Sequence, residues 1–193
     1  MSPSLNEIYE KIDKAITYLS QDKPIDKWKI QKSVFYFLWL DSLNNHYDFM
    51  EVANKIQIHP DKQGPYSEAI AGEVEMLVRD GFLKAIDPYS KEFPVKALPK
   101  GISEFKKGID AKEEFCLLKI KNIVNMLDSY EVVFFIYYNP YIPENIKKYF
   151  ISQSEIKEGF LLKKDKYIKK LLECGLIDDL TANKMLKKIA ETE

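Results

Sequence analysis

The chain has 193 residues, of which 46% are hydrophobic, 31% charged and 13% aromatic. This length predicts one domain, or one domain with an appendage, and the apolar content excludes disorder over most of the chain. Lysine and arginine (29) balance aspartate and glutamate (30), so the excess of positive charge typical of nucleic-acid or membrane-surface binding is absent. The longest apolar run, residues 34–40, is too short to span a bilayer, and the N-terminus lacks a signal-peptide pattern. We therefore expect a cytoplasmic protein.

Apolar residues at helical spacing predict the first two helices. Over residues 4–20, Ile8, Ile12 and Ile16 share one face, and Ser4 forms a capping box with Glu7. A second helix is expected over 26–44. Residues 34–40 are apolar on every side of this helix, so it is either the centre of a helical domain or part of it faces a second subunit.

Two more helices, over 47–56 and 67–80, are separated by a predicted loop at 59–65 (HPDKQGP). Ser67 is a favourable N-cap, and Gly81 suits the left-handed position that ends a helix. Extended patterns at 82–86 and 93–97, with turn residues between them, predict a β-hairpin. Another helix is expected to start near Pro99.

The rest of the chain is predicted to be helical over 112–127, 143–150, 165–174 and 179–191. Residues 131–138 (EVVFFIYY) fit either a helix or a buried strand, because a short apolar run has no clear period. The aromatic runs near 35–39 and 134–138 lack interleaved basic residues, which favours a place in the core over base stacking. We place the domain boundary between 1–105 and 106–193.

No sequence pattern points to catalysis or to a bound cofactor. Phosphate-binding glycine loops and the nucleophile turn are absent, and the carboxylates alternate with lysines at helix-surface spacing. The histidines, His46 and His59, and the cysteines, Cys116 and Cys174, do not have the spacing of metal ligands. We predict a non-enzymatic protein with no catalytic residues, no metal and no cofactor.

Three helices followed by a two-stranded hairpin is the order of a winged helix. The segments KIQKSVFYF, QGPYSEAIAGEVEMLVRDGFLK and ALPKG, within residues 26–105, resemble those of winged helix-turn-helix proteins. They are similar in particular to an uncharacterised group that pairs a K-hydrophobic-Q-K first helix with a GPYS turn. The YwgA-like and Panacea (SocA-like antitoxin) proteins show related patterns. The resemblance implies a mainly α protein with a small β-hairpin: a winged helix-turn-helix domain plus a C-terminal helical extension.

The resemblance also implies a DNA-binding transcription regulator, expected to be a homodimer because such regulators bind paired half-sites. In a winged helix, the third core helix enters the major groove and the wing contacts the backbone or minor groove. Transferred to this chain, the candidate contacts to double-stranded DNA lie on the first core helix, before the acidic helix and on the hairpin: Lys29, Lys32, Lys62, Gln63, Tyr66, Ser67, Tyr89, Lys91 and Lys96.

The helix over 67–80 opposes this function by its charge. It carries Glu68, Glu73, Glu75 and Asp80 against one cation, Arg79. Affinity for DNA depends largely on neutralising phosphates, so these carboxylates weaken it. The alternative function is a protein-protein interaction adaptor or antitoxin-like module that holds a partner protein on the same fold. A third possibility is a small apolar effector bound by the C-terminal region.

The surface discriminates between the first two functions. A continuous stripe joining Lys29, Lys32, Lys62 and Lys91 would favour DNA binding. Outward-facing glutamates on the acidic helix, on a surface that is otherwise neutral, would favour the adaptor.

Overall fold

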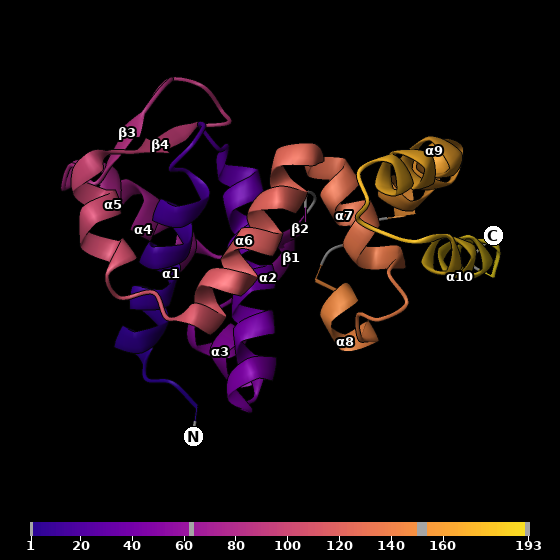
Figure 1. The fold of residues 1–193 in the computed structure, drawn as a ribbon, viewed down its shortest axis with the longest axis horizontal. Coiled ribbons are helices and arrows are strands. Elements are labelled where there is room, and N and C mark those ends of the chain that lie inside the picture. Colours follow the sequence, from indigo (N-terminus) through magenta and orange to yellow (C-terminus); the bar gives the residue numbers. More distant parts are fainter. Residues whose placement is uncertain (1, 62–63, 150–153, 192–193) are drawn as a thin grey trace. The chain divides into compact units, whose positions relative to one another are not determined.

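The computed structural model describes residues 2–61, 64–149 and 154–191, which are mainly helical with a few short strands (Figure 1). The chain divides into two compact units: residues 1–58 with 66–122, and residues 59–65 with 123–193. The expected boundary was at 105/106, whereas in this division residues 106–122 belong to the first unit, in which Glu113 forms an ion pair with Lys11. None of the helices in the described residues has the length and apolar character needed to cross a membrane.

The first unit holds five complete helices, a hairpin and most of a sixth helix. These are α1 (Leu5–Leu19), α2 (Lys27–Asn45), α3 (Phe49–Lys55), α4 (Glu68–Arg79), β3 (Leu83–Ala85), β4 (Val95–Ala97), α5 (Pro99–Lys106) and α6 (Ala111–Met126). The predicted elements are confirmed to within a few residues. Their ends follow local signals: the Ser4–Glu7 capping box, an Asp26 cap on Lys29 N–H (2.8 Å), and Gly81 at φ +75°.

The central helix of the first unit is α2. Val34, Phe35, Phe37 and Leu38 are each 0% exposed in the single chain. Helices α1, α3 and α4 pack against α2, and α1 also packs against α4, α5 and β4 (Figure 1). Most of the all-apolar segment is therefore buried within the single chain, as the centre of a helical unit.

Strands β3 and β4 form an antiparallel hairpin that is fixed on its outer side by Ile25. The pairs are Leu83 with Ala97, Lys84 with Lys96 and Ala85 with Val95. Ile25 exchanges two 3.0 Å backbone hydrogen bonds with Val95. The hairpin is therefore joined to the segment before α2, and β4 also packs against α1.

Gly101, the glycine of the ALPKG segment, allows α5 to pack directly on the chain that follows α4. A Cβ at Gly101 would lie 2.5 Å from the carbonyl oxygen of Phe82. The aromatic ring of Phe82 also makes an edge contact with Phe105 of α5, at 5.3 Å between centroids. The close approach of the Phe82 carbonyl oxygen excludes any larger residue at Gly101 unless the backbone moves.

The second unit contains β1 (His59–Asp61), the first residues of β2 (Gly64–Tyr66), and four helices, α7 (Ser129–Tyr138), α8 (Glu144–Lys147), α9 (Ser154–Glu173) and α10 (Asp179–Ala190). The predicted loop at 59–65 was wrong, since β1 and β2 pair as a two-stranded sheet. Helix α8 is shorter than predicted, and residue 150 lies outside the described residues. Helix α9 begins before its predicted start, and α10 is confirmed.

Residues 131–138 are helical, which settles the choice between helix and strand. The Phe134 ring lies 5.0 Å from Tyr138, 5.5 Å from Phe160 and 4.9 Å from Tyr167, measured between centroids. Phe134 and Tyr138 are each 1% exposed. The prediction that this aromatic run forms core is confirmed.

Candidate functional site

Buried hydrogen bonds join the KIQK segment of α2 to the GPYS segment before α4. The Gln31 amide nitrogen donates to the carbonyl oxygen of Ser67 (3.0 Å), and the Gln31 amide oxygen accepts from Ser67 N–H (3.0 Å). The Ser67 hydroxyl donates to the carbonyl oxygen of Ile56 (2.6 Å) and accepts from Ile70 N–H as the N-cap of α4. Gln31 and Ser67 are 3% and 0% exposed, so they position α4 from inside the unit.

A groove of about 220 Å³ lies where α2, α4 and the hairpin loop meet. Its lining comes from the first turns of α2, from α4 with the residue before Ser67, and from the loop between β3 and β4: Lys27, Gln31, Tyr66, Glu68, Ala71, Val74, Glu75, Ser90 and Phe93. Of the predicted DNA contacts that the structure describes, Tyr66 alone is in this lining.

Backbone contacts fix the hairpin loop against α2. Lys27 N–H donates to the carbonyl oxygen of Glu92 (2.9 Å), and Phe93 N–H donates to the carbonyl oxygen of Ser90 (3.1 Å). Phe93 has φ +42°, a left-handed conformation that a side-chain-bearing residue keeps only where its surroundings impose it. The loop that closes one side of the groove is therefore held in a defined position.

The α4 wall of the groove is acidic. Glu68 and Glu75 are exposed and both line the groove, while Lys27 lies on the α2 side. Arg79, the cation of α4, pairs with the neighbouring Asp80 (3.1 Å) and leaves the two glutamates uncompensated within their own helix. The groove thus presents separated charges of both signs beside the aromatic groups of its lining.

The hairpin carries the clearest cluster of lysines near the groove. The register places Lys84 directly opposite Lys96 on one face of the hairpin, and like charges in this arrangement repel. In the loop, Lys91 is exposed and Tyr89 is 97% exposed. Lys84 was missed among the predicted contacts, although the alternation at 83–85 opposite 95–97 was a signal for it.

Burial removes two of the predicted DNA contacts from the surface. Ser67 caps α4, and Lys32 is 2% exposed with its ammonium within 3.5 Å of the Trp28 carbonyl oxygen. Lys29 is half-exposed in the first turn of α2, whereas Lys62 and Gln63 lie outside the described residues. The lysine stripe expected for DNA binding is therefore interrupted at Lys32.

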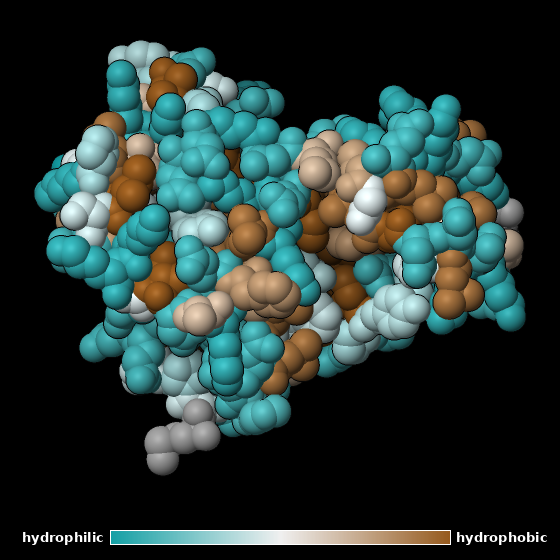
Figure 2. Space-filling view, in the orientation of Figure 1, coloured by the Kyte–Doolittle hydropathy of each residue, from teal (hydrophilic) through white to brown (hydrophobic). Residues whose placement is uncertain are grey.

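A second hollow lies on α5 and is more open and more apolar than the groove. It is lined by Pro99, Ile102, Ser103, Lys106 and Lys107. Figure 2 shows exposed apolar side chains among hydrophilic ones over the part of the first unit where α5 lies. This hollow lacks the opposed charges of the groove.

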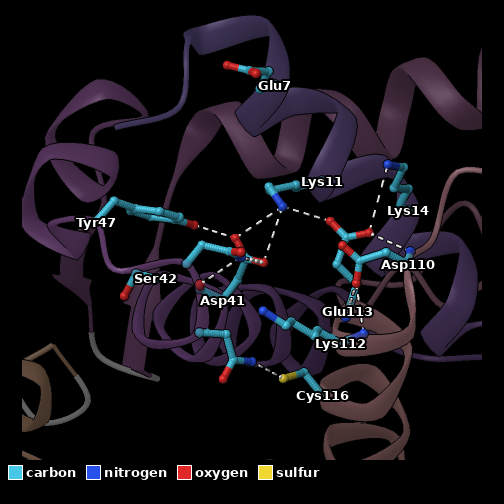
Figure 3. A network of polar contacts seen from close by, with 12 residues as sticks. Glu7, Lys11, Lys14, Asp41, Ser42, Tyr47, Asp110, Lys112, Glu113 and Cys116 are labelled. Carbon is cyan, nitrogen blue, oxygen red and sulfur yellow. Dashed lines mark hydrogen bonds and ion pairs between the residues drawn. The ribbon is translucent and has the colours of Figure 1, made fainter. Parts of the chain in front are cut away.

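A buried cluster of charged groups joins α1, α2 and α6 in the first unit (Figure 3). The Lys11 ammonium contacts the carboxylates of Asp41 (3.1 Å) and Glu113 (2.7 Å), whose side chains are 3% and 5% exposed. The Tyr47 hydroxyl donates to Asp41, and the Lys14 ammonium lies 3.9 Å from Glu113. One lysine thus connects two buried carboxylates from different helices.

The protonation of this cluster suits a structural role. Burial alone would lower the pKa of Lys11, but the hydrogen bonds and charges of Glu113 and Asp41 outweigh burial and raise it. The pKa of Tyr47 is raised, first by burial and then by its hydrogen bond to Asp41. General acid-base catalysis requires a group that exchanges a proton near neutral pH. The raised pKa values of Lys11 and Tyr47 do not meet this requirement.

Two further observations concern chemistry in the described residues. The described residues contain no group of three or more His, Cys, Asp or Glu side chains placed to hold a metal ion. Burial raises the pKa of the Cys116 thiol, whereas reactive cysteines need a lowered pKa.

Comparisons with protein-family models, curated proteins and solved structures found no match.

Proposed function

We propose that this chain is a cytoplasmic, non-enzymatic protein-binding module of the winged-helix type, which holds a segment of a partner protein in the groove between α2, α4 and the hairpin loop. The observation that carries the proposal is the outward-facing acidic wall formed by Glu68 and Glu75. A partner with a lysine or arginine flanked by apolar side chains complements such a wall, whereas DNA phosphates are repelled by it.

The arrangement of the first unit supports the winged-helix part of the proposal. Helices α2, α3 and α4 are followed by β3 and β4, and Ile25 pairs with the outer side of β4. When the first unit is compared with a winged helix, α4 corresponds to the recognition helix and the β3–β4 loop corresponds to the wing. The groove is therefore made by the elements that a winged helix presents to its target.

The test reverses the charge of the groove wall. We expect Glu68→Lys with Glu75→Lys to weaken binding of the natural partner at least tenfold, because two attractive charges become repulsive. The partner is captured from extracts of the source cells with the tagged full chain, purified, and titrated against both proteins by calorimetry.

The matched control is Glu104→Lys with Glu114→Lys, which makes the same change of net charge at exposed positions of α5 and α6. This control should bind the partner like the unaltered chain. Equal weakening by both double variants, or no weakening by the groove variant, would show that the partner does not occupy the groove.

The facing lysines of the hairpin favour a second candidate, binding of double-stranded DNA by a homodimer. Lys84 and Lys96 repel each other across the strands, and phosphate groups between or beside them would relieve this repulsion. Lys91 and the exposed Tyr89 extend the same hairpin toward its tip. This candidate uses the hairpin and leaves the acidic wall of α4 outside the DNA groove.

Fluorescence anisotropy of labelled mixed-sequence duplex DNA at two salt concentrations tests this candidate. We expect Lys84→Glu with Lys96→Glu to weaken binding and to reduce the salt slope by about two, since two phosphate contacts are lost. Lys119→Glu, on α6, is the single-site control and should change neither quantity substantially. If the unaltered chain does not bind at low salt, the DNA candidate is rejected.

A further inference from the structure

A buried carboxyl group of α1 faces a carboxyl group of α4. Asp13 is 9% exposed and lies within hydrogen-bonding reach of Glu73, where α1 packs against α4. One oxygen of Asp13, Oδ1, is buried with no hydrogen-bond partner among the described residues. Thr17, one turn further along α1, also has a buried hydroxyl oxygen without such a partner.

Two ionised carboxylates in contact provide acceptors only, so this geometry requires a proton. If one group is protonated, its O–H donates to the other, and the repulsion between two negative charges disappears. The same rule makes paired carboxyl groups share one proton in other proteins. Asp13 is the better holder of that proton, because it is buried while Glu73 is half-exposed.

We propose that Asp13 carries a proton in the folded protein at neutral pH and donates it to Glu73, and that loss of this proton under alkaline conditions loosens the packing of α4 on α1. The groove lies on the same helix, since Ala71, Val74 and Glu75 flank Glu73. A movement of α4 on α1 would therefore shift the proposed binding surface with it. This inference rests on the proposed function only where it connects Asp13 to partner binding, because the test of the proton itself uses the chain alone.

The charges around Asp13 support this assignment. Burial first, then the charge and hydrogen bond of Glu73, then the charge of Glu10, raise the pKa of Asp13 to about 8. Among the described residues, α2, α5 and β4, which also pack on α1, supply no charge that acts on this carboxyl. The adjacent Lys14 instead pairs with Glu10 (2.8 Å) and lies 3.9 Å from Glu113.

The sign of the pH dependence follows from this pKa. The unfolded chain releases the Asp13 proton near pH 4, whereas the folded chain keeps it to about pH 8. Between these values the folded state binds more protons than the unfolded state, so rising pH favours unfolding by up to tenfold per pH unit. Above about pH 8 this contribution becomes constant.

The experiment compares the urea unfolding of the full chain with that of Asp13→Asn from pH 5 to pH 9. Asparagine keeps the shape of the protonated group and its N–H can donate to Glu73. We expect the two proteins to be similar at pH 5, and the unfolding equilibrium constant of the unaltered chain to exceed that of D13N at least tenfold at pH 9. Lys147 of the second unit, with its pKa lowered to about 8 chiefly by burial, titrates equally in both proteins and cancels.

Glu10→Gln is the control, since this side chain is 61% exposed and should leave most of the pH dependence in place. Parallel pH profiles for the unaltered chain and D13N would overturn the proposal. If D13N does not fold, carbon-13 NMR titration of the Asp13 carboxyl in the unaltered chain decides, and an ordinary pKa near 4 would overturn it. The link to the groove requires the amide signals of Glu68 and Glu75 to shift with the same midpoint near pH 8, and their constancy would refute it.

Discussion

Replacing Lys11 with methionine is expected to lower the free energy of unfolding by about 3–5 kcal/mol, as is typical when one partner of a buried ion pair is removed. The substitution leaves two carboxylates, Asp41 and Glu113, without their shared cation, and their side chains are only 3% and 5% exposed. Chemical denaturation at neutral pH, followed by circular dichroism, measures the effect.

Lys14→Met is the matched control for this prediction. Lys14 lies on the same helix, but its closest partner is the 61% exposed Glu10, and Glu113 is 3.9 Å away. We expect a loss of about 1 kcal/mol or less, the range of surface ion pairs. Equal effects of the two substitutions would contradict the assignment of Lys11 as the connection between α1, α2 and α6.

The raised pKa of Lys11 also fixes the pH range of its contribution. A lysine whose pKa is raised on folding stabilises the folded state below its unfolded pKa, and this stabilisation disappears as the pH rises through the folded value. The difference between the unaltered chain and Lys11→Met should therefore persist at neutral pH and decrease only in strongly alkaline solution.

Replacing Gln31 with leucine is expected to lower the free energy of unfolding by about 1–3 kcal/mol. The leucine fills a similar volume but leaves the buried N–H of Ser67 without a partner, whereas the carbonyl oxygen of Ser67 still accepts from Ala71 N–H (3.1 Å). One such unpaired buried group costs about 1–3 kcal/mol. Urea denaturation measures the loss. The same substitution should also displace α4 and the groove, because Ser67 is the N-cap of that helix.

Gln21→Leu serves as the comparison, since Gln21 is half-exposed and follows the end of α1. Its stability should stay within about 0.5 kcal/mol of the unaltered chain, as for most surface substitutions. If Gln31→Leu is equally mild, the KIQK and GPYS segments have a role other than fixing α4.

Several elements could be predicted because their signals are local. The ends of α1, α2 and α4 depend on side chains that bond to backbone groups within three residues, such as Ser4 with Glu7 and Asp26 with Lys29. Helix α7 had such a signal as well: Asp128 and Glu131 form a capping box before the apolar run. Extending that helix back to Asp128 would have resolved the choice between helix and strand.

The strands β1 and β2 gave a weaker signal. Each has three residues, and Pro60, Gly64 and Pro65 are residues that normally interrupt regular structure. Such short strands exist because they pair, and pairing depends on the conformation of the whole segment rather than on local propensity. A pattern-based prediction therefore assigned a loop.

The candidate site was predictable in part. The position of Tyr66 before an acidic helix and of Tyr89 and Lys91 between two strands follows from the sequence. The burial of Lys32 and Ser67 does not follow from the sequence, because lysine and serine are usually exposed, whereas both are buried inside the first unit. Only the packed structure shows that the predicted lysine stripe is interrupted.

The sequence by itself determined that the protein is mainly helical with a hairpin, and where its first helices begin and end. The tertiary structure decided which charged groups meet: Lys11 with Glu113, and Asp13 with Glu73, come from helices far apart in the chain. Helix caps and hairpin turns act between neighbouring residues, so one sequence contains them completely. Contacts between distant helices depend on how apolar faces pack around α2, and a pattern along the chain does not specify that packing.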